Sequence, residues 1–208
     1  MLTQHLVRSG DVWPMDHIEV PNQFLISYDS EFNFRQSIND CGPYSAAAMV
    51  RAVAGKEADS NEFASTMSWR LPRIGYHPWG LEKKLEEEGI HFIVPKNVSN
   101  ATDEQKIQYL RYRLSHGGPI IILGEKNGYQ HYVTLLGYNS GKDEFYIYDS
   151  WHDKGVGNLT VDDNGDLPGN RTLSESELMD FWRDGGMFGF YKWYAIVTLP
   201  ESELDWHM

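Results

Sequence analysis

The strongest constraint on the fold is a run of three strand-like segments in the second half of the chain. The segments PIIILGE, YQHYVTLLGYN and EFYIYDS, at 119–125, 129–139 and 144–150, are rich in β-branched and aromatic residues. Turn residues separate them, first Lys126-Asn127-Gly128 and then Ser140-Gly141. Because such short connections join antiparallel neighbours, this pattern predicts an antiparallel meander.

Helical patterns fill most of the chain before this meander. Residues 42–54 are predicted to be a helix, with Pro43 in its first turn, an alanine run behind it and Gly55 as its stop. We expect further helices after Asp59 or Ser60, in the segment GYHPWGLEKKLEEEG that ends at Gly89, and over 102–116, where Thr102 and Gln105 form a capping box.

The remaining segments complete the predicted fold. NQFLISY (22–28), IHFIVP (90–95) and FGFYKWYAIVTL (188–199) are expected to be strands, and GNLTVDDNGDLPG (157–169) a loop or hairpin. SESELMDFW (174–182) begins with a second capping box and is expected to be a helix. Since helices precede an antiparallel sheet, the fold class is α+β.

Length and charge limit the class of protein. The 208 residues fit one domain, with 1–35 as an N-terminal extension or strand region. The net charge of −12 argues against binding nucleic acid or anionic membranes, since both need clustered basic residues. No apolar run approaches the roughly 20 residues of a membrane span. The first twenty residues lack the apolar core of a Sec signal peptide, so we expect a cytoplasmic location, with non-Sec export left open.

The only cysteine, Cys41, stands at the start of the first predicted helix. A single cysteine excludes an internal disulfide, and two roles remain, a buried apolar side chain or a nucleophile. The polar flanks Asn39-Asp40 and Gly42-Pro43 are poor core surroundings. A helix N-terminus stabilises a thiolate, the reactive form, which favours the nucleophile.

Thiol catalysis also needs a base, a group that orients the base and an oxyanion donor. His131 lies nine residues before the Ser140-Gly141 turn and Asp149 eight residues after it, so the two are predicted to be neighbours at one sheet edge. Gln36, five residues before Cys41, is an uncharged donor for an oxyanion, with Asn39 as the alternative. Together Cys41, His131, Asp149 and Gln36 predict a catalytic site.

These residues resemble a known family. Gln36 followed by Asp40-Cys41-Gly42-Pro43, then His131-Tyr132-Val133 and Tyr148-Asp149, looks like the C39-like family of papain-fold cysteine peptidases. The resemblance runs from about Gln36 to Ser150 and implies a papain-like fold. It also implies Cys41 as nucleophile, His131 as base, Asp149 as orienting group, and Gln36 with the Cys41 N–H as oxyanion hole. Ser150 stands where family members usually carry proline.

Aromatic residues near these motifs are candidates for substrate binding. We expect His77 and Trp79, in the GYHPWG turn, and Trp151, after Asp149, to line the substrate cleft. His77 is also the strongest rival to His131 as the base, and His152 is close enough in sequence to Asp149 to touch the site. The DDNGD run at 162–166 lacks EF-hand spacing and is interpreted as a hairpin turn. Neither a metal nor a cofactor is expected.

The predicted function is a cysteine peptidase or thiol hydrolase that cleaves a peptide or other amide through an acyl-enzyme on Cys41. Three alternatives stay open: an acyltransferase, a transglutaminase-like enzyme, and an inactive peptidase-like binding module. The expected partner is a peptide or amide substrate, without nucleic acid or membrane insertion, and the sequence leaves the oligomeric state open.

Overall fold

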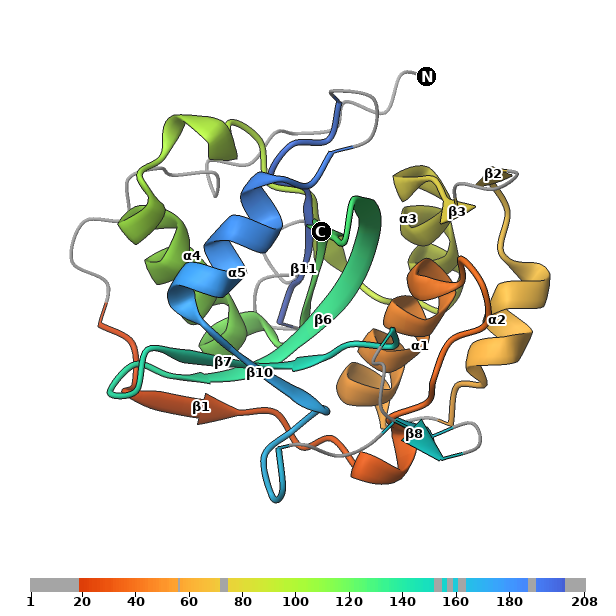
Figure 1. The fold of residues 1–208 in the computed structure, drawn as a ribbon, viewed down its shortest axis with the longest axis horizontal. Helices are drawn as coiled ribbons and strands as arrows, with labels where there is room; N and C mark the ends of the chain where they lie inside the picture. The colour runs from red at the N-terminus through yellow and green to blue at the C-terminus, as the bar shows by residue number, and fades with distance from the viewer. Residues whose placement is uncertain are drawn as a thin grey trace, which may run out of the picture.

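A seven-stranded antiparallel sheet lies at the centre of the structure (Figure 1). The computed structural model describes residues 19–55, 57–71, 75–151, 155–156, 159–160, 164–186 and 190–200. The strands follow the order β10-β7-β6-β5-β11-β4, and β1 also pairs with β6. Their bounds are β1 (Gln23–Leu25), β4 (Phe92–Ile93), β5 (Ile120–Lys126), β6 (Tyr129–Asn139), β7 (Glu144–Tyr148), β10 (Arg171–Ser174) and β11 (Ala195–Thr198).

The predicted meander is formed by β5, β6 and β7. The turn residues Asn127 and Gly128 both have positive φ, 53° and 81°, as a tight type I′ hairpin requires. The second turn is longer than predicted, spanning Ser140 to Asp143. The first half of β6 pairs with β5, and its second half pairs with β7 on one side and β1 on the other. Gly137 permits the approach of β1, because a Cβ there would lie 2.6 Å from the carbonyl oxygen of Phe24.

Helices cover both faces of the sheet (Figure 1). In β5, Ile120 and Ile122 pack in the core with the helices α4 and α5, while Ile121 and Leu123 pack in the core with α1, α2 and α3. Because both faces are buried, the strands contain nearly continuous apolar runs. The helix bounds are α1 (Cys41–Ala54), α2 (Ser60–Thr66), α3 (Pro78–Glu87), α4 (Asp103–Gly117) and α5 (Glu175–Arg183), with 3-10 turns at Ser30–Phe32 and Val98–Asn100.

Helix α1 packs closely against the sheet. It begins at Cys41, one residue before the predicted start, and ends at Gly55, whose φ of +59° gives a left-handed cap. The three alanines at 46–48 are fully buried and let the helix approach β6, where the Thr134 hydroxyl donates to the Ser45 carbonyl at 3.2 Å. Gly42 leaves room for α3, since a Cβ there would lie 3.0 Å from Leu81 Cδ1. This packing fixes the position of Cys41.

Several strands differ from the predicted ones. The strands β1, β4 and β11 are shorter than predicted, and β11 starts late because Tyr191 and Trp193 have left-handed backbones, with φ of 60° and 58°. Strand β10, which pairs with β7, was not predicted. Strand β9 (Leu159–Thr160), within the segment expected to be a loop or hairpin, pairs with β8 (Gly155–Val156), which precedes that segment. Elsewhere in the chain, β2 (Arg70–Leu71) pairs with β3 (Gly75–Tyr76).

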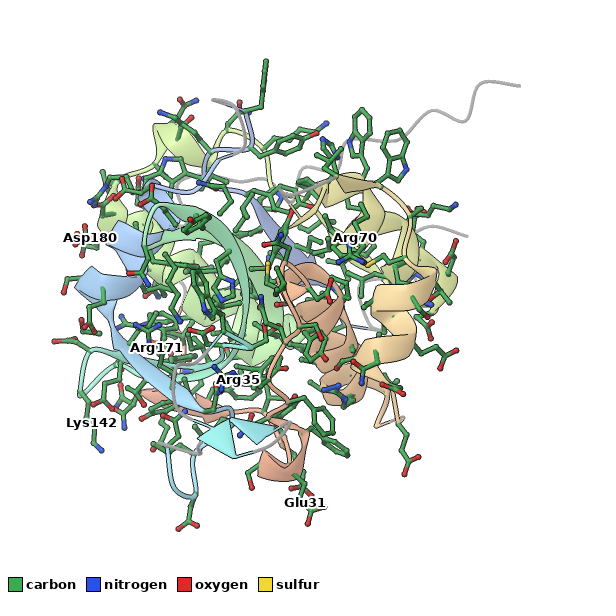
Figure 2. The ribbon with its side chains drawn as sticks, turned by 45° about the vertical axis from the view of Figure 1, so that its right-hand side comes forward. Glu31, Arg35, Arg70, Lys142, Arg171 and Asp180 are labelled. Carbon is green, nitrogen blue, oxygen red and sulfur yellow. The ribbon has the colours of Figure 1, made fainter. Side chains whose placement is uncertain are left out.

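The described helices are all too short or too polar to cross a bilayer. Charged side chains such as Glu31, Lys142 and Asp180 lie at the periphery of the ribbon (Figure 2).

Candidate active site

Cys41 is the first residue of α1, where the helix presents unpaired backbone N–H groups. Its side chain is 6% exposed and packs in a core that includes Tyr76 and Tyr132. The preceding residue, Asp40, is held by an ion pair with Arg70 at 3.1 Å. The helix N-terminus favours a negatively charged sulfur at this position.

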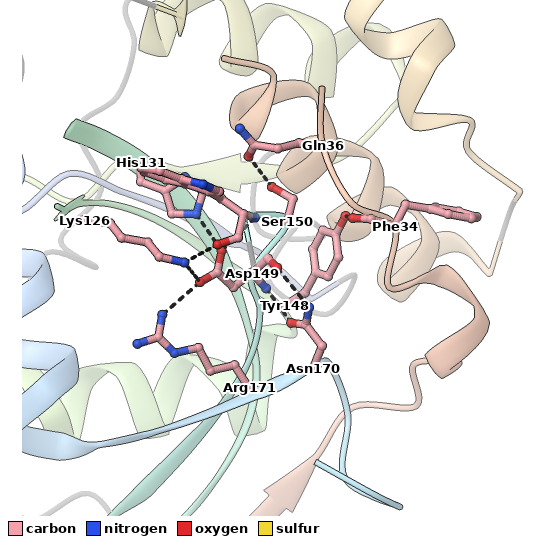
Figure 3. Close-up of polar contacts among 10 residues, drawn as sticks. Phe34, Gln36, Lys126, His131, Tyr148, Asp149, Ser150, Asn170 and Arg171 are labelled. Carbon is pink, nitrogen blue, oxygen red and sulfur yellow. Dashed lines mark hydrogen bonds and ion pairs between the residues drawn. The ribbon is translucent and has the colours of Figure 1, made fainter. Parts of the chain in front are cut away.

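His131 and Asp149 form a buried pair next to this helix end. His131 is the third residue of β6, and Asp149 directly follows β7. The Nε2 atom of His131 lies 2.7 Å from Oδ1 of Asp149, and the two side chains are 1% and 0% exposed (Figure 3). The structure therefore brings these two residues together across the β6–β7 pair.

Charge keeps this pair ionised. Burial lowers the pKa of His131, but the Asp149 carboxylate and, to a smaller extent, the Cys41 thiol outweigh it and raise that pKa to about 9. For Asp149 burial acts in the opposite direction and raises the pKa, but His131 and Lys126 outweigh burial and hold that pKa well below its usual range. The Cys41 thiol is near enough to the imidazole to contribute to its raised pKa, and since Nε2 faces Asp149, Nδ1 is the ring nitrogen left for the thiol. Cys41, His131 and Asp149 thus form one connected array.

The Asp149 carboxylate accepts four hydrogen bonds. Oδ1 accepts from His131 and from the Trp151 N–H at 2.9 Å, and Oδ2 accepts from Lys126 Nζ at 2.8 Å and from Arg171 Nη1 at 2.9 Å. The Asn170 side chain also brackets the Asp149 backbone, accepting from its N–H at 2.8 Å and donating to its carbonyl at 2.9 Å. Each oxygen of the Asp149 carboxylate therefore has two hydrogen-bond donors, which fix its orientation.

Gln36 lies on the other side of the same segment. Its amide oxygen accepts from the Ser150 hydroxyl at 2.8 Å, and its backbone N–H donates to the Ser150 carbonyl at 3.0 Å. These contacts turn the side-chain nitrogen away from Ser150 (Figure 3). Ser150 stands where the family usually carries proline, and its hydroxyl fixes the orientation of the Gln36 amide. The amide –NH2 group is left to donate elsewhere.

Trp151 covers the His131 ring. Its ring centroid lies 5.6 Å from that of His131 in an edge-to-face arrangement, and 6.0 Å from that of Tyr129. This contact shields one side of the His131–Asp149 hydrogen bond from water.

His77 and Trp79 belong to a separate aromatic cluster, which we define as Trp69, His77, Trp79 and Tyr191. The ring centroid of His77 lies 4.8 Å from Trp79 and 5.2 Å from Tyr191, and Trp69 and Trp79 are 53% and 52% exposed. His77 Nδ1 accepts from the Trp79 N–H and caps α3. Burial lowers the pKa of His77, although Glu82 opposes this shift. His77 is therefore a helix cap, whereas His131 is the histidine that pairs with Asp149.

The strand that leads into the aromatic cluster adjoins the loop before the cysteine. Strand β3, which directly precedes His77, passes that loop, and a Cβ on Gly75 would lie 3.4 Å from the Asn39 carbonyl. The Tyr132 hydroxyl, next to His131 in sequence, donates to the Tyr76 carbonyl at 3.2 Å.

Four residues of the site were not predicted: Lys126, Ser150, Asn170 and Arg171. Lys126 ends β5 at the edge where His131 lies, so its turn position was a usable signal. Asn170 and Arg171 reach Asp149 only because β10 pairs with β7. His152 lies outside the described residues, as do the first two residues of the DDNGD run. The described residues contain no group of three or more His, Cys, Asp or Glu side chains that could hold a metal ion.

The arrangement defines a class: a papain-like α+β fold with Cys, His and Asp side chains gathered between a helical layer and an antiparallel sheet. Residues 18–167 match the model of the Peptidase_C39 like family, and the chain belongs to that family. Among solved structures it resembles the peptidase domain of Streptococcus ComA, described as a bi-functional ABC transporter involved in a quorum sensing pathway. The TM-score is 0.52 at 16% identity, over 81% of this chain and 97% of that domain, a similarity of fold. The comparison with curated proteins gives no match.

Proposed function

We propose that the chain is a thiol hydrolase that cleaves a peptide or other amide bond through an acyl-enzyme on Cys41. The observation that carries the proposal is the buried array in which Asp149 holds His131 at 2.7 Å and His131 in turn contacts the Cys41 thiol. A nucleophile, a base and an orienting group in hydrogen-bond contact are what covalent acyl transfer requires.

In the first half-reaction, the thiolate of Cys41 attacks the carbonyl carbon and forms an S–C bond. The Gln36 side-chain N–H and the Cys41 backbone N–H donate to the oxyanion, and one such donor contributes roughly 2.7–4 kcal/mol. As the C–N bond breaks, the imidazolium of His131 gives its proton to the departing amine.

In the second half-reaction, neutral His131 takes a proton from water, and the resulting hydroxide attacks the thioester. The S–C bond breaks, the acid product leaves, and Cys41 returns as a thiolate beside protonated His131. Asp149 stays ionised throughout and fixes which ring nitrogen faces the sulfur.

We further propose that the aromatic cluster and Trp151 contact the substrate. Trp79 offers an exposed ring in the first turn of α3, and His77 accepts a hydrogen bond from its backbone N–H as the helix cap. Trp79→Ala should therefore raise KM severalfold and leave the alkylation rate of Cys41 unchanged, because the ring is outside the catalytic array. An unchanged KM would show that the aromatic cluster does not contact the substrate.

The function is tested by trapping the acyl-enzyme. The full-length chain is incubated with a library of peptides and activated amides, and intact mass spectrometry records an adduct on the protein together with the cleaved product. We expect the adduct in the wild type and none in Cys41→Ala. His131→Ala should remain folded, with a lower free energy of unfolding because it removes one partner of the buried pair, and it should form no product.

The acceptor is identified in the same assay. A severalfold acceleration by an added amine, with the amide product detected, would assign the site to acyl transfer. Absence of any adduct or product across the library, in a protein whose fold is verified, would contradict the proposed catalysis.

A further inference from the structure

The catalytic carboxylate contacts two more cations than its pairing with His131 requires. Lys126 Nζ and Arg171 Nη1 both bind Oδ2 of Asp149, at 2.8 and 2.9 Å, while His131 binds Oδ1. The Asp149 side chain is fully buried, whereas those of Lys126 and Arg171 are 15% and 36% exposed. One negative charge is therefore shared among three groups that can carry a positive charge.

Lys126 also reaches the residue that covers His131. Its ammonium donates to the Trp151 carbonyl and lies 5.3 Å from the centroid of the Trp151 ring. That ring packs against His131. A single side chain from the end of β5 thus connects the carboxylate of Asp149 with the cover of the imidazole.

Arg171 approaches from the opposite strand. It is the first residue of β10 and follows Asn170, which brackets the backbone of Asp149. Since β5 and β10 lie on opposite sides of the β6–β7 pair, the two cations hold the carboxylate from two directions.

The other ionisable groups near this network lie on two sides. On the inner side are the Cys41 thiol and the imidazole of His131, with the phenol of Tyr148 next to Asp149 in sequence. On the outer side Lys126 and Arg171 line a pocket of about 340 Å³ together with the carboxylates of Glu125, Glu177, Asp180 and Asp184. Of these groups, only Lys126 and Arg171 add fixed positive charge directly to the Asp149 carboxylate.

We propose that Lys126 and Arg171 are positioning residues that hold Asp149 ionised and facing His131, and that their charge sets the pH range in which the Cys41–His131 pair is active. The inference rests on the proposed function, since it concerns the same array. Neither residue contacts the reacting atoms, and both act through Asp149.

The sign of their effect follows from charge. A fixed cation disfavours protonated His131 and favours a thiolate at Cys41. Removing it should make His131 hold its proton to higher pH and should make the thiolate form at higher pH. Both limbs of the pH profile then move in the alkaline direction, so the profile is displaced rather than narrowed. Lys126 and Arg171 are each separated from the imidazole by a single carboxylate, so removing either charge should move the titration of His131 by roughly one pH unit.

The test compares Lys126→Met, Lys126→Arg and Arg171→Gln in the full-length protein. The proton resonances of the His131 ring are followed by NMR against pH, assigned from the spectrum of His131→Gln. The pH dependence of Cys41 alkylation by iodoacetamide is measured in parallel. We expect both titrations to move up by roughly one pH unit in Lys126→Met and in Arg171→Gln. They should return close to wild type in Lys126→Arg, which keeps the charge.

Lys142→Met is the matched control, because Lys142 lies in the β6–β7 turn at the edge of the molecule (Figure 2). It should leave both titrations unchanged. The pH profiles of Lys126→Met and Arg171→Gln could instead have the same limbs as the wild-type profile and only a lower plateau rate. In that case the two residues serve the fold alone and the proposal is wrong. The NMR titration needs no turnover, so failure of the proposed function, seen as an absent acyl-enzyme, is distinguishable from failure of this inference. Should Lys126→Met fail to fold, the titrations of Arg171→Gln and Lys126→Arg still test whether these charges set the pH range.

Discussion

Replacing Asp149 with asparagine should be far more harmful than its near-identical shape suggests. The two carboxylate oxygens accept four hydrogen bonds, from His131, the Trp151 N–H, Lys126 and Arg171. An amide offers one accepting oxygen. In either orientation its –NH2 group faces two donors, so two hydrogen bonds are lost and donors are placed against donors.

The magnitude follows from burial and charge. Asp149 is 0% exposed, and without it Lys126 and His131 lose their shared counter-charge inside the protein. Removing one partner of a buried ion pair typically costs about 3–5 kcal/mol. We expect a loss of that size in the free energy of unfolding, because asparagine leaves the packing volume unchanged and the whole effect is electrostatic.

The assay is urea unfolding at about pH 7, compared with Asp166→Asn. Asp166 is exposed, so that variant should stay within about 0.5 kcal/mol of wild type. The same samples should show slow alkylation of Cys41 in Asp149→Asn, since burial without the carboxylate lowers the pKa of His131. A loss under about 1 kcal/mol would show instead that the four donors do not depend on the carboxylate.

Three further predictions follow from the structure. First, burial lowers the pKa of His131, but Asp149 outweighs burial and raises that pKa to about 9. Protonated His131 therefore stabilises the fold fully below about pH 6.5, and this contribution is lost as the pH rises through 9. Urea midpoints should fall over that range in wild type and stay level in His131→Gln. Second, Gln36→Ala should lower kcat about 10²–10³-fold with little change in KM in steady-state kinetics, as expected for an oxyanion donor. A rise in KM alone would make Gln36 a binding residue. Third, Gly80→Ala should destabilise the protein by about 1–3 kcal/mol in thermal unfolding, because its Cβ would lie 2.5 Å from the Ser68 carbonyl oxygen. An unaltered melting temperature would show that the Ser68 segment yields freely.

Local sequence rules predicted the elements that carry the site. The Asn127-Gly128 turn and the spacing around the second turn placed the start of β6 beside the end of β7, and the capping boxes at Thr102 and Ser174 marked the starts of α4 and α5. Cys41 at a helix start followed from Pro43 and the alanine run. These features are set by neighbouring residues, so the sequence is sufficient to predict them.

Long-range pairing accounts for what the sequence did not predict. Strand β10 forms only because it pairs with β7, and it alone brings Asn170 and Arg171 to Asp149. The contact between Gln36 and Ser150 joins residues 114 positions apart. Side chains that matter through such pairings have no periodic signature, so Arg171 looks like an ordinary charged residue in the sequence. Lys126 differs, because its place beside the Asn127-Gly128 turn was a usable signal.

Whether Cys41 is an activated nucleophile is tested by its rate of alkylation with iodoacetamide at about pH 6, where a free peptide cysteine is almost wholly protonated. The chain has a single cysteine, so the modified site is unambiguous. We expect wild-type Cys41 to react faster than the free peptide cysteine, and His131→Ala to reduce the rate to or below that reference. A wild-type rate no higher than the free cysteine, in a folded protein, would contradict this expectation.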